Sequence, residues 1–334
     1  MRLNIEMSFI YIESQIKGHP ESLAIINKFP KREVIEINHY GEIFNPTNQS
    51  FRKQKQSPSI IIAKKTNNLI LKSPENFGIG GSGNYYFSHM LNCPYDCRYC
   101  FLQGMFNSAN YVIFVNYDDY KAKISNLDKK AKDKQYFFSG YDADSLAFDH
   151  VTNFTNSFVP FFHDLKNSYL ELRTKSTQIR SLLKYPAHDN IIIAFSFTPE
   201  EISKKIEHKV PDFNKRLLAI EKLVSHGYKI GLRFDPLVYC SNFEELYLKM
   251  FEKIFKAVPK ESIHSISIGK LRFPNKMYDK IIKLYPDDPM LNYKITKDKK
   301  HSGYGADIEK QMFDIVQSAL EPYVDQALIF KCYT

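Results

Sequence analysis

The sequence is poor in cysteine and contains no long apolar run. Five cysteines in 334 residues is an odd and sparse count, which argues against a disulfide scaffold and favours a reducing, cytoplasmic location. The purest apolar stretches, such as 191–197, have the length of a strand and fall far short of the roughly 18 residues that a membrane helix needs. The apolar core near the start, at 8–12, is too short for a secretory signal. We therefore expect a cytoplasmic protein with no membrane segment.

Internal repeats and low-complexity tracts are also absent, and the composition is that of an ordinary globular protein. Hydrophobic residues make up 43% and charged residues 25% of the chain, which excludes a disordered protein. The net charge of +9 permits a polyanionic partner such as nucleic acid without requiring one. A chain of this length has room for about two domains or one large one.

The sequence divides into two predicted regions. Residues 1–56 are predicted to form a small N-terminal α/β unit followed by a basic linker. In this unit a strand at 9–12 precedes a helix that starts at Pro20, and a second strand follows at 33–37. Residues 44–57 are polar and basic, as in a linker or an exposed arm.

Residues 57–334 alternate short apolar runs with amphipathic helical patterns, including those at 243–254 and 308–319. Such alternation favours a mostly parallel sheet, and this many units favour a partial (β/α) barrel over an open sheet. Catalytic groups are then expected at the C-terminal ends of the strands. The predicted strands are 85–90, 111–115, 136–139, 169–174, 191–196, 229–234, 262–268 and 327–331.

Three cysteines gather in eight residues, as Cys93, Cys97 and Cys100, after the predicted strand 85–90. Soft ligands so closely spaced suit an iron–sulfur cluster or zinc. A structural zinc site wants four ligands, and His89 is the candidate for the fourth. Three thiolates fit a [4Fe–4S] cluster that leaves one iron open. A chance grouping of structural cysteines is the remaining alternative.

This C-x3-C-x2-C loop, with Tyr99 before its last cysteine, resembles the radical S-adenosylmethionine superfamily. Further motifs resemble its spore photoproduct lyase family, and they occur in family order along nearly the whole chain. They are 57–65, 100–103, 172–176, 195–197, 269–274 and 303–305.

The resemblance implies a [4Fe–4S] cluster held by Cys93, Cys97 and Cys100, with S-adenosylmethionine bound at the open iron. It further implies reductive cleavage to a 5′-deoxyadenosyl radical, which attacks a methylene-bridged thymine dimer in DNA. The electron would come from a flavodoxin- or ferredoxin-like donor. Cofactors carry such chemistry, while the protein orients the reactants and keeps the site dry.

The resemblance also implies contacts to S-adenosylmethionine. Tyr99 matches an aromatic position near the adenine, and Lys175 would pair with the carboxylate as a point charge. Gly140 would allow the backbone to approach the amino end closely. Asp144 and Ser196 match further positions near the cofactor. Lys175 and Ser196 stand at predicted strand ends, as a barrel requires.

Two positions depart from the family pattern. The family places a cysteine that returns a hydrogen atom to the product where this chain has Tyr141, and a relay tyrosine where it has Phe101. Tyr141 and Cys240 are therefore the candidate hydrogen donors. Cys240 is also readily explained as a small buried hydrophobe.

Nucleic-acid binding is supported by basic residues interleaved with aromatics, although such runs are often only solvated surface. Two functions other than repair or modification of a nucleobase in DNA stay open. One is radical chemistry on a non-DNA substrate, and the other is a non-catalytic metal-bearing module that binds nucleic acid. The basic residues are Arg52, Lys53, Lys55, Lys294, Lys297, Lys299, Lys300 and His301.

Overall fold

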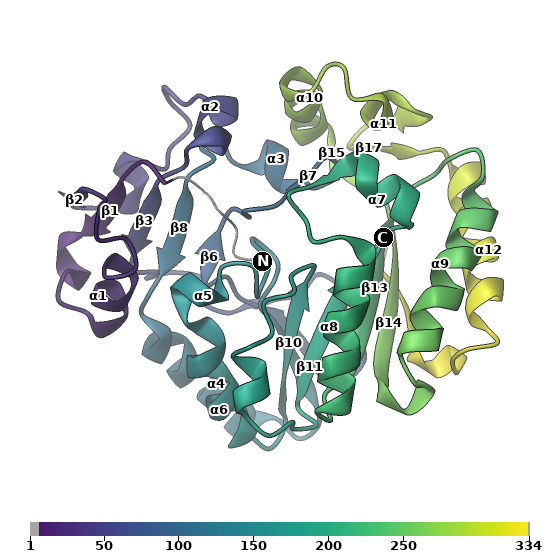
Figure 1. Cartoon of the computed structure of the whole chain (residues 1–334), viewed down its shortest axis with the longest axis horizontal. Coiled ribbons are helices and arrows are strands. Elements are labelled where there is room, and N and C mark those ends of the chain that lie inside the picture. The colour runs from purple at the N-terminus through teal and green to yellow at the C-terminus, as the bar shows by residue number, and fades with distance from the viewer. Residues whose placement is uncertain (1–6, 333–334) are drawn as a thin grey trace.

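A computed structural model describes residues 7–332 as two curved sheets that meet along one side, with helices around them (Figure 1). The larger sheet has eight strands in the order β18-β14-β13-β11-β10-β9-β5-β4, and only the β4–β5 pair is antiparallel. Its strands are β4 (Leu71–Lys72), β5 (Gly83–Tyr86), β9 (Gln135–Phe138), β10 (Ser168–Thr174), β11 (Ile191–Ser196), β13 (Lys229–Leu237), β14 (Ile263–Lys270) and β18 (Ile329–Cys332).

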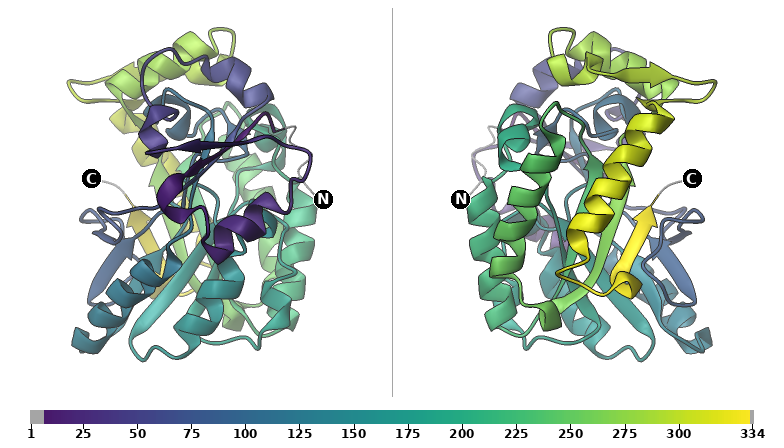
Figure 2. Two further views of the ribbon diagram at one scale, coloured as in Figure 1. Left: turned by 90° about the vertical axis from the view of Figure 1, so that its left-hand side faces the viewer. Right: turned by 90° about the vertical axis from the view of Figure 1, so that its right-hand side faces the viewer.

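Helices cover the outer face of this sheet, and α9 and α12 lie side by side on it (Figure 2). The predicted helical patterns at 243–254 and 308–319 are confirmed as these two helices. The α/β fold with a partial barrel and a small N-terminal α/β unit is thereby confirmed. The helices of the chain are α1 (Pro20–Ile26), α2 (Phe51–Gln56), α3 (Leu102–Met105), α4 (Tyr117–Lys130), α5 (Asp149–Thr152), α6 (Phe154–His163), α7 (Glu200–Ile206), α8 (Phe213–Ser225), α9 (Phe243–Ala257), α10 (Asn275–Leu284), α11 (Pro289–Asn292) and α12 (Ala306–Leu320).

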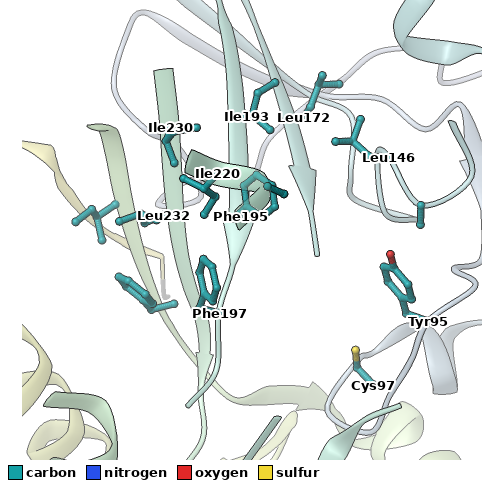
Figure 3. Packing of buried hydrophobic residues seen from close by; sticks show 14 of the residues in the cluster. Tyr95, Cys97, Leu146, Leu172, Ile193, Phe195, Phe197, Ile220, Ile230 and Leu232 are labelled. Carbon is teal, nitrogen blue, oxygen red and sulfur yellow. The ribbon is translucent and has the colours of Figure 1, made fainter. Parts of the chain in front are cut away.

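Side chains alternate between the two faces of the curved sheet, as the pleat of a strand requires. On β10, Leu170 and Leu172 join the apolar core under the helices, so Glu171 and Arg173 point to the concave inner face. Figure 3 shows Leu172 of β10 in that core with Ile193 and Phe195 of β11. The inner face thus carries charged side chains on β10, whereas Tyr136 and Phe138 of β9 and Ile192 of β11 form a separate apolar cluster there.

The smaller sheet has five strands in the order β2-β1-β3-β8-β6. The predicted strand–helix–strand unit at its start is confirmed, with His19 capping α1 before Pro20. The predicted strand 111–115 exists, but it lies in this sheet and not in the barrel. The sheet draws strands from both sides of residue 57, and the proposed division of the chain there stays a prediction. The strands are β1 (Ile10–Glu13), β2 (Val34–Ile37), β3 (Ile60–Ala63), β6 (Met90–Leu91) and β8 (Tyr111–Phe114).

Two predictions from the sequence are wrong, one about a strand and one about a linker. The predicted strand 85–90 ends with β5 at Tyr86, and the chain then crosses to the smaller sheet, where β6 pairs with β8. The predicted basic linker at 44–57 contains helix α2, which buries Phe51 and Lys55. An apolar and a basic side chain four residues apart share one face of a helix, and both are covered here.

A small antiparallel sheet, β15-β17-β16, lies with α10 and α11 beside α3 (Figure 1). The basic stretch 294–301 forms most of its β16–β17 hairpin, and Lys294, Lys297, Lys299 and Lys300 are exposed there. Among residues 7–332, no helix is long and apolar enough to cross a membrane. The remaining strands are β7 (Asp96–Cys97), β12 (Glu207–His208), β15 (Arg272–Pro274), β16 (Ile295–Lys297) and β17 (His301–Tyr304).

Candidate active site

The cysteine loop runs from β6 to α3 and is fixed to a distant segment of the chain. Within it, β7 pairs antiparallel with β12, so Cys97 lies opposite Glu207. The amide of Arg98 donates to the carbonyl of Ile206 at 2.9 Å. Cys97 is buried, and Figure 3 shows it with Tyr95 in the same apolar core as Phe195 and Phe197. The smaller sheet therefore holds the start of the loop through β6, and the β7–β12 pairing holds its middle.

The three thiols lie within electrostatic range of one another in a desolvated setting. Burial raises the pKa of all three, that of Cys93 to about 12. The positive charges of Lys55 and Lys175 act in the opposite direction: Lys55 on Cys93 and Cys100, and Lys175 on Cys97 and Cys100. Two flanking ammonium groups favour negative charge at this loop, and a metal ion or cluster must displace the thiol protons to bind.

Within residues 7–332, no three His, Cys, Asp or Glu side chains form a group ready to enclose a metal ion. The donor chemistry of the loop nevertheless fits an iron–sulfur cluster, because three soft ligands on one short loop interact electrostatically with one another and with two cations. His89, the candidate fourth zinc ligand, stacks on Phe154 at a ring distance of 3.9 Å. Burial lowers the pKa of His89 to about 3, so its ring is a neutral packing group against α6.

Tyr99 is buried and forms part of a hydrogen-bonded network. Its hydroxyl donates to Glu207 Oε1, and Arg216 Nη2 lies 2.8 Å from Glu207 Oε2. Ser203 and Thr198 also donate to this carboxylate. Lys175 Nζ lies 5.4 Å from the centre of the Tyr99 ring, a cation–π distance. The structure therefore brings together two predicted cofactor contacts, Tyr99 and Lys175, next to Cys97.

Asp144 ties the loop after β9 to the end of β10. Its Oδ1 accepts from the amides of Leu146 and Ala147 and from the hydroxyl of Thr174, and its Oδ2 accepts from the amide of Lys175 at 2.6 Å. Burial raises the pKa of Asp144, and these hydrogen bonds act against the rise. Both carboxylate oxygens thus help to fix the backbone from which the Lys175 side chain projects.

Gly140 and Ser196 are also close to this edge of the sheet. A Cβ at Gly140 would stand 2.9 Å from Cβ and O of Arg173, so the close backbone approach made possible by this glycine is to β10. Ser196 ends β11, is buried, and its carbonyl accepts from Arg216 at 2.9 Å. Arg216 thus joins the β11 end to the Glu207 network.

The two positions that depart from the family pattern are neighbours. The ring centres of Tyr141 and Phe101 are 5.5 Å apart, and Tyr86 of β5 lies 4.5 Å from Tyr141. Tyr141 is 43% exposed, which leaves its ring accessible to a ligand. Cys240 follows β13 and interacts with the charges of Lys205 and Glu201 of α7.

Several residues of the site carried no recognisable signal in the sequence. Glu207 sits in a run of charged residues that resembles solvated surface, yet it is buried. The sequence placed Lys55 among the basic residues expected to contact nucleic acid, and that expectation is wrong for Lys55, because its side chain is buried against the cysteine loop. Asp235, at the end of β13, interacts with the charges of Arg173 and Lys175. A Cβ on Gly269 would clash with its carboxylate, so this glycine makes room for Asp235 inside the barrel.

Comparison with known proteins agrees with this architecture. A profile of the family Spore photoproduct lyase matches residues 6–328. The chain is 24% identical to spore photoproduct lyase of Bacillus subtilis (strain 168) over 331 residues, covering 95% of this chain and 94% of that protein. It is 23% identical to spore photoproduct lyase of Geobacillus sp. (strain Y412MC61), covering 73% and 72%.

Solved structures show the same fold over the full length. A spore photoproduct lyase mutant with bound AdoMet and dinucleoside spore photoproduct superposes with a TM-score of 0.82 at 17% identity, covering 98% of each chain. A second structure, a mutant with dinucleoside spore photoproduct, gives 0.84 at 17% identity and the same coverage. The family indicated by the sequence motifs, and with it a lyase-type enzyme, is confirmed: the chain belongs to the spore photoproduct lyase family.

Proposed function

We propose that this protein is a radical S-adenosylmethionine enzyme that acts on a thymine-dimer lesion or a nucleobase in DNA. The observation that carries the proposal is the placement of Cys93, Cys97 and Cys100 beside Tyr99 and Lys175 at the C-terminal ends of the barrel strands. When bound, a [4Fe–4S] cluster and S-adenosylmethionine together supply a 5′-deoxyadenosyl radical. Relatives whose structures contain AdoMet and spore photoproduct support this substrate class.

Each part of the site would have its own role in this function. The three cysteines would hold the cluster, and Lys175 would bind the carboxylate of S-adenosylmethionine, with its backbone fixed by Asp144. Tyr99, fixed through Glu207, would pack near the adenine. The exposed hairpin lysines and Arg52 would contact the phosphates of DNA. A flavodoxin- or ferredoxin-like protein would supply the electron.

The test is the rate of S-adenosylmethionine cleavage by anaerobically reconstituted protein. We expect 5′-deoxyadenosine to form, and to form faster with DNA that contains spore photoproduct than with undamaged DNA. An equal rate of cleavage with and without the lesion would instead support a non-DNA substrate. Tyr141 and Phe101, which depart from the family pattern, also favour that alternative. Stoichiometric zinc without sulfide would support the non-catalytic alternative.

Lys175→Ala is expected to weaken the binding of S-adenosylmethionine. A charge-assisted hydrogen bond to a carboxylate contributes about 1.5–3 kcal/mol, which corresponds to roughly 10- to 150-fold in affinity. Equilibrium binding to the reconstituted protein measures the change. Lys204→Ala, on the exposed side of α7, is the matched control and should bind like the wild type. Equal affinities in the two variants would show that Lys175 does not contact the cofactor.

Tyr141→Cys is expected to shift the products toward intact thymine. A thiol donates a hydrogen atom to a carbon radical more readily than a phenol does, so the wild type should cleave S-adenosylmethionine yet repair spore photoproduct poorly. Product analysis by chromatography and mass spectrometry measures the ratio of repaired thymine to adducts. Efficient repair by the wild type that persists in Tyr141→Phe and in Cys240→Ala would show that neither residue donates the hydrogen.

A further inference from the structure

Lys55 is a buried cation at the cysteine loop that comes from the N-terminal part of the chain. It lies on α2, and its side chain is only 10% exposed, in contrast to its helical neighbour Lys53, which is exposed. Phe51, one helical turn earlier, is also buried, and the Lys55 ammonium lies 5.7 Å from its ring centre. Because a buried lysine is costly unless it is paired, its partners indicate what it does.

Apart from the Phe51 ring, the described contacts of the Lys55 ammonium are with the cysteine loop. Lys55 Nζ donates to the carbonyls of Cys93 at 3.3 Å and Tyr95 at 3.2 Å. Asp96 Oδ1 lies 4.0 Å away. One ammonium group thus donates to two carbonyls of the loop between the first and second cysteines and lies at ion-pair distance from Asp96 of the same loop.

The helix that carries Lys55 is itself fixed in place. Lys209, which follows β12, donates from Nζ to the carbonyl of Lys55 at 3.1 Å. On the other side, Gln54 Oε1 accepts from the amide of Ala109, beyond α3. Since β12 also pairs with β7 of the cysteine loop, the ammonium is held against the loop from two directions and cannot easily swing to solvent.

The Asp96 carboxylate is shared between Lys55 and several other side chains. Arg98 Nη1 lies 3.0 Å from Asp96 Oδ2, and Gln103 and Tyr285 also donate to this carboxylate. Arg98 is paired in turn with Asp288 at 3.3 Å and stacks over the Tyr285 ring. The shared carboxylate leaves positive charge at Lys55 unbalanced on the side of Cys93.

We propose that Lys55 is a positioning residue for the cluster, and that its charge raises the reduction potential of whatever thiolate-ligated centre the loop holds. The inference rests on the proposed function, because it takes Cys93, Cys97 and Cys100 as the ligands. A fixed positive charge in a low-dielectric site stabilises the more negative, reduced form. Its hydrogen bonds to two loop carbonyls also hold the loop in shape before the cluster binds.

Three substitutions separate the charge from the hydrogen bonds. Lys55→Arg keeps both, Lys55→Gln keeps donors without charge, and Lys55→Met keeps neither. The measurements are the midpoint potential of the reconstituted cluster, by a spectroscopically monitored redox titration, and the thermal unfolding of the apo-protein. Lys53→Met on the same helix is the matched control.

We expect Lys55→Gln and Lys55→Met to give a more negative midpoint potential than the wild type, while Lys55→Arg and Lys53→Met keep the wild-type value. The apo-protein should unfold earliest in Lys55→Met, and Lys55→Gln should lie between it and the wild type. If Lys55→Met does not fold, Lys55→Gln decides the question of charge.

Two outcomes would overturn the inference. If the midpoint potential were unchanged in Lys55→Gln and the apo-protein were less stable, Lys55 would stabilise the loop without affecting the potential. If the wild-type protein assembled no iron and sulfide, this result would contradict the proposed function and, with it, the inference about Lys55. The iron and sulfide content of the wild type distinguishes these two failures.

Discussion

Replacing any one of Cys93, Cys97 or Cys100 with alanine is expected to abolish both the iron–sulfur absorbance and the reductive cleavage of S-adenosylmethionine. An open-iron cluster is held by three protein thiolates, and loss of one leaves two, too few to keep the cluster in place. Visible absorption, iron and sulfide content, and 5′-deoxyadenosine formation by anaerobically reconstituted variants measure the effect.

Cys240→Ala and Cys332→Ala are the matched controls for this experiment. Cys240 faces charges of α7, and Cys332 is buried near Asp235 and Arg173 at the end of β18. Both variants should keep the absorbance and the cleavage activity. A cluster that survives in one of the first three variants and is lost in Cys240→Ala or Cys332→Ala would show that the ligands have been assigned wrongly.

Glu207→Gln is expected to destabilise the folded protein strongly. Glu207 and Arg216 are both completely buried, with Arg216 Nη2 and Glu207 Oε2 2.8 Å apart. Removing one charge of a buried pair leaves the other uncompensated and typically costs about 3–5 kcal/mol. The free energy of unfolding, from urea denaturation at pH 7, measures the loss.

A double variant separates the lost charge from lost packing. In Glu207→Gln with Arg216→Met, no buried charge is left without a partner, so much of the stability should return. Tyr99 also loses its carboxylate acceptor in Glu207→Gln, and we expect S-adenosylmethionine to bind more weakly in both variants. A double variant less stable than the single variant by a further large step would contradict this account.

The same pair makes the wild type sensitive to acid. Burial alone would raise the pKa of Glu207, but Arg216, Lys175 and the hydrogen bonds from Ser203 and Tyr99 lower it to about 2. A carboxyl whose pKa is lower in the folded than in the unfolded state stabilises the fold above the unfolded pKa, and this stabilisation is lost as the pH falls toward the folded value. Between about pH 5 and pH 2, Glu207→Gln should therefore lose less stability than the wild type.

Some features of this protein can be predicted from short stretches of sequence. The strand β11 occupies the predicted range 191–196, and α9 and α12 cover the predicted helical patterns. The cysteine motif is equally local, because three cysteines within eight residues must lie near one another wherever the loop goes. Patterns of this kind depend on neighbours along the chain.

Short stretches of sequence did not predict which strand belongs to which sheet. The apolar run 111–115 has the same pattern as the barrel strands, yet β8 pairs with β3 and lies in the smaller sheet. The run 85–90 is divided between the two sheets, with β5 in one and β6 in the other. Which edge a strand joins depends on the partners that the whole fold offers, and those are remote in sequence.

The hydrogen bonds made by charged residues of the site could likewise not be predicted from the sequence. Glu207 meets Tyr99 from 108 residues away, and Lys55 meets Cys93 and Tyr95 across about 40 residues. In the sequence both charges look like solvated surface, because the desolvation and the partners that define their role appear only when distant segments pack. The sequence by itself determined the cysteine loop and several of the helices and strands, whereas the folded chain decided which charges surround that loop, since burial and pairing are properties of contacts between remote residues.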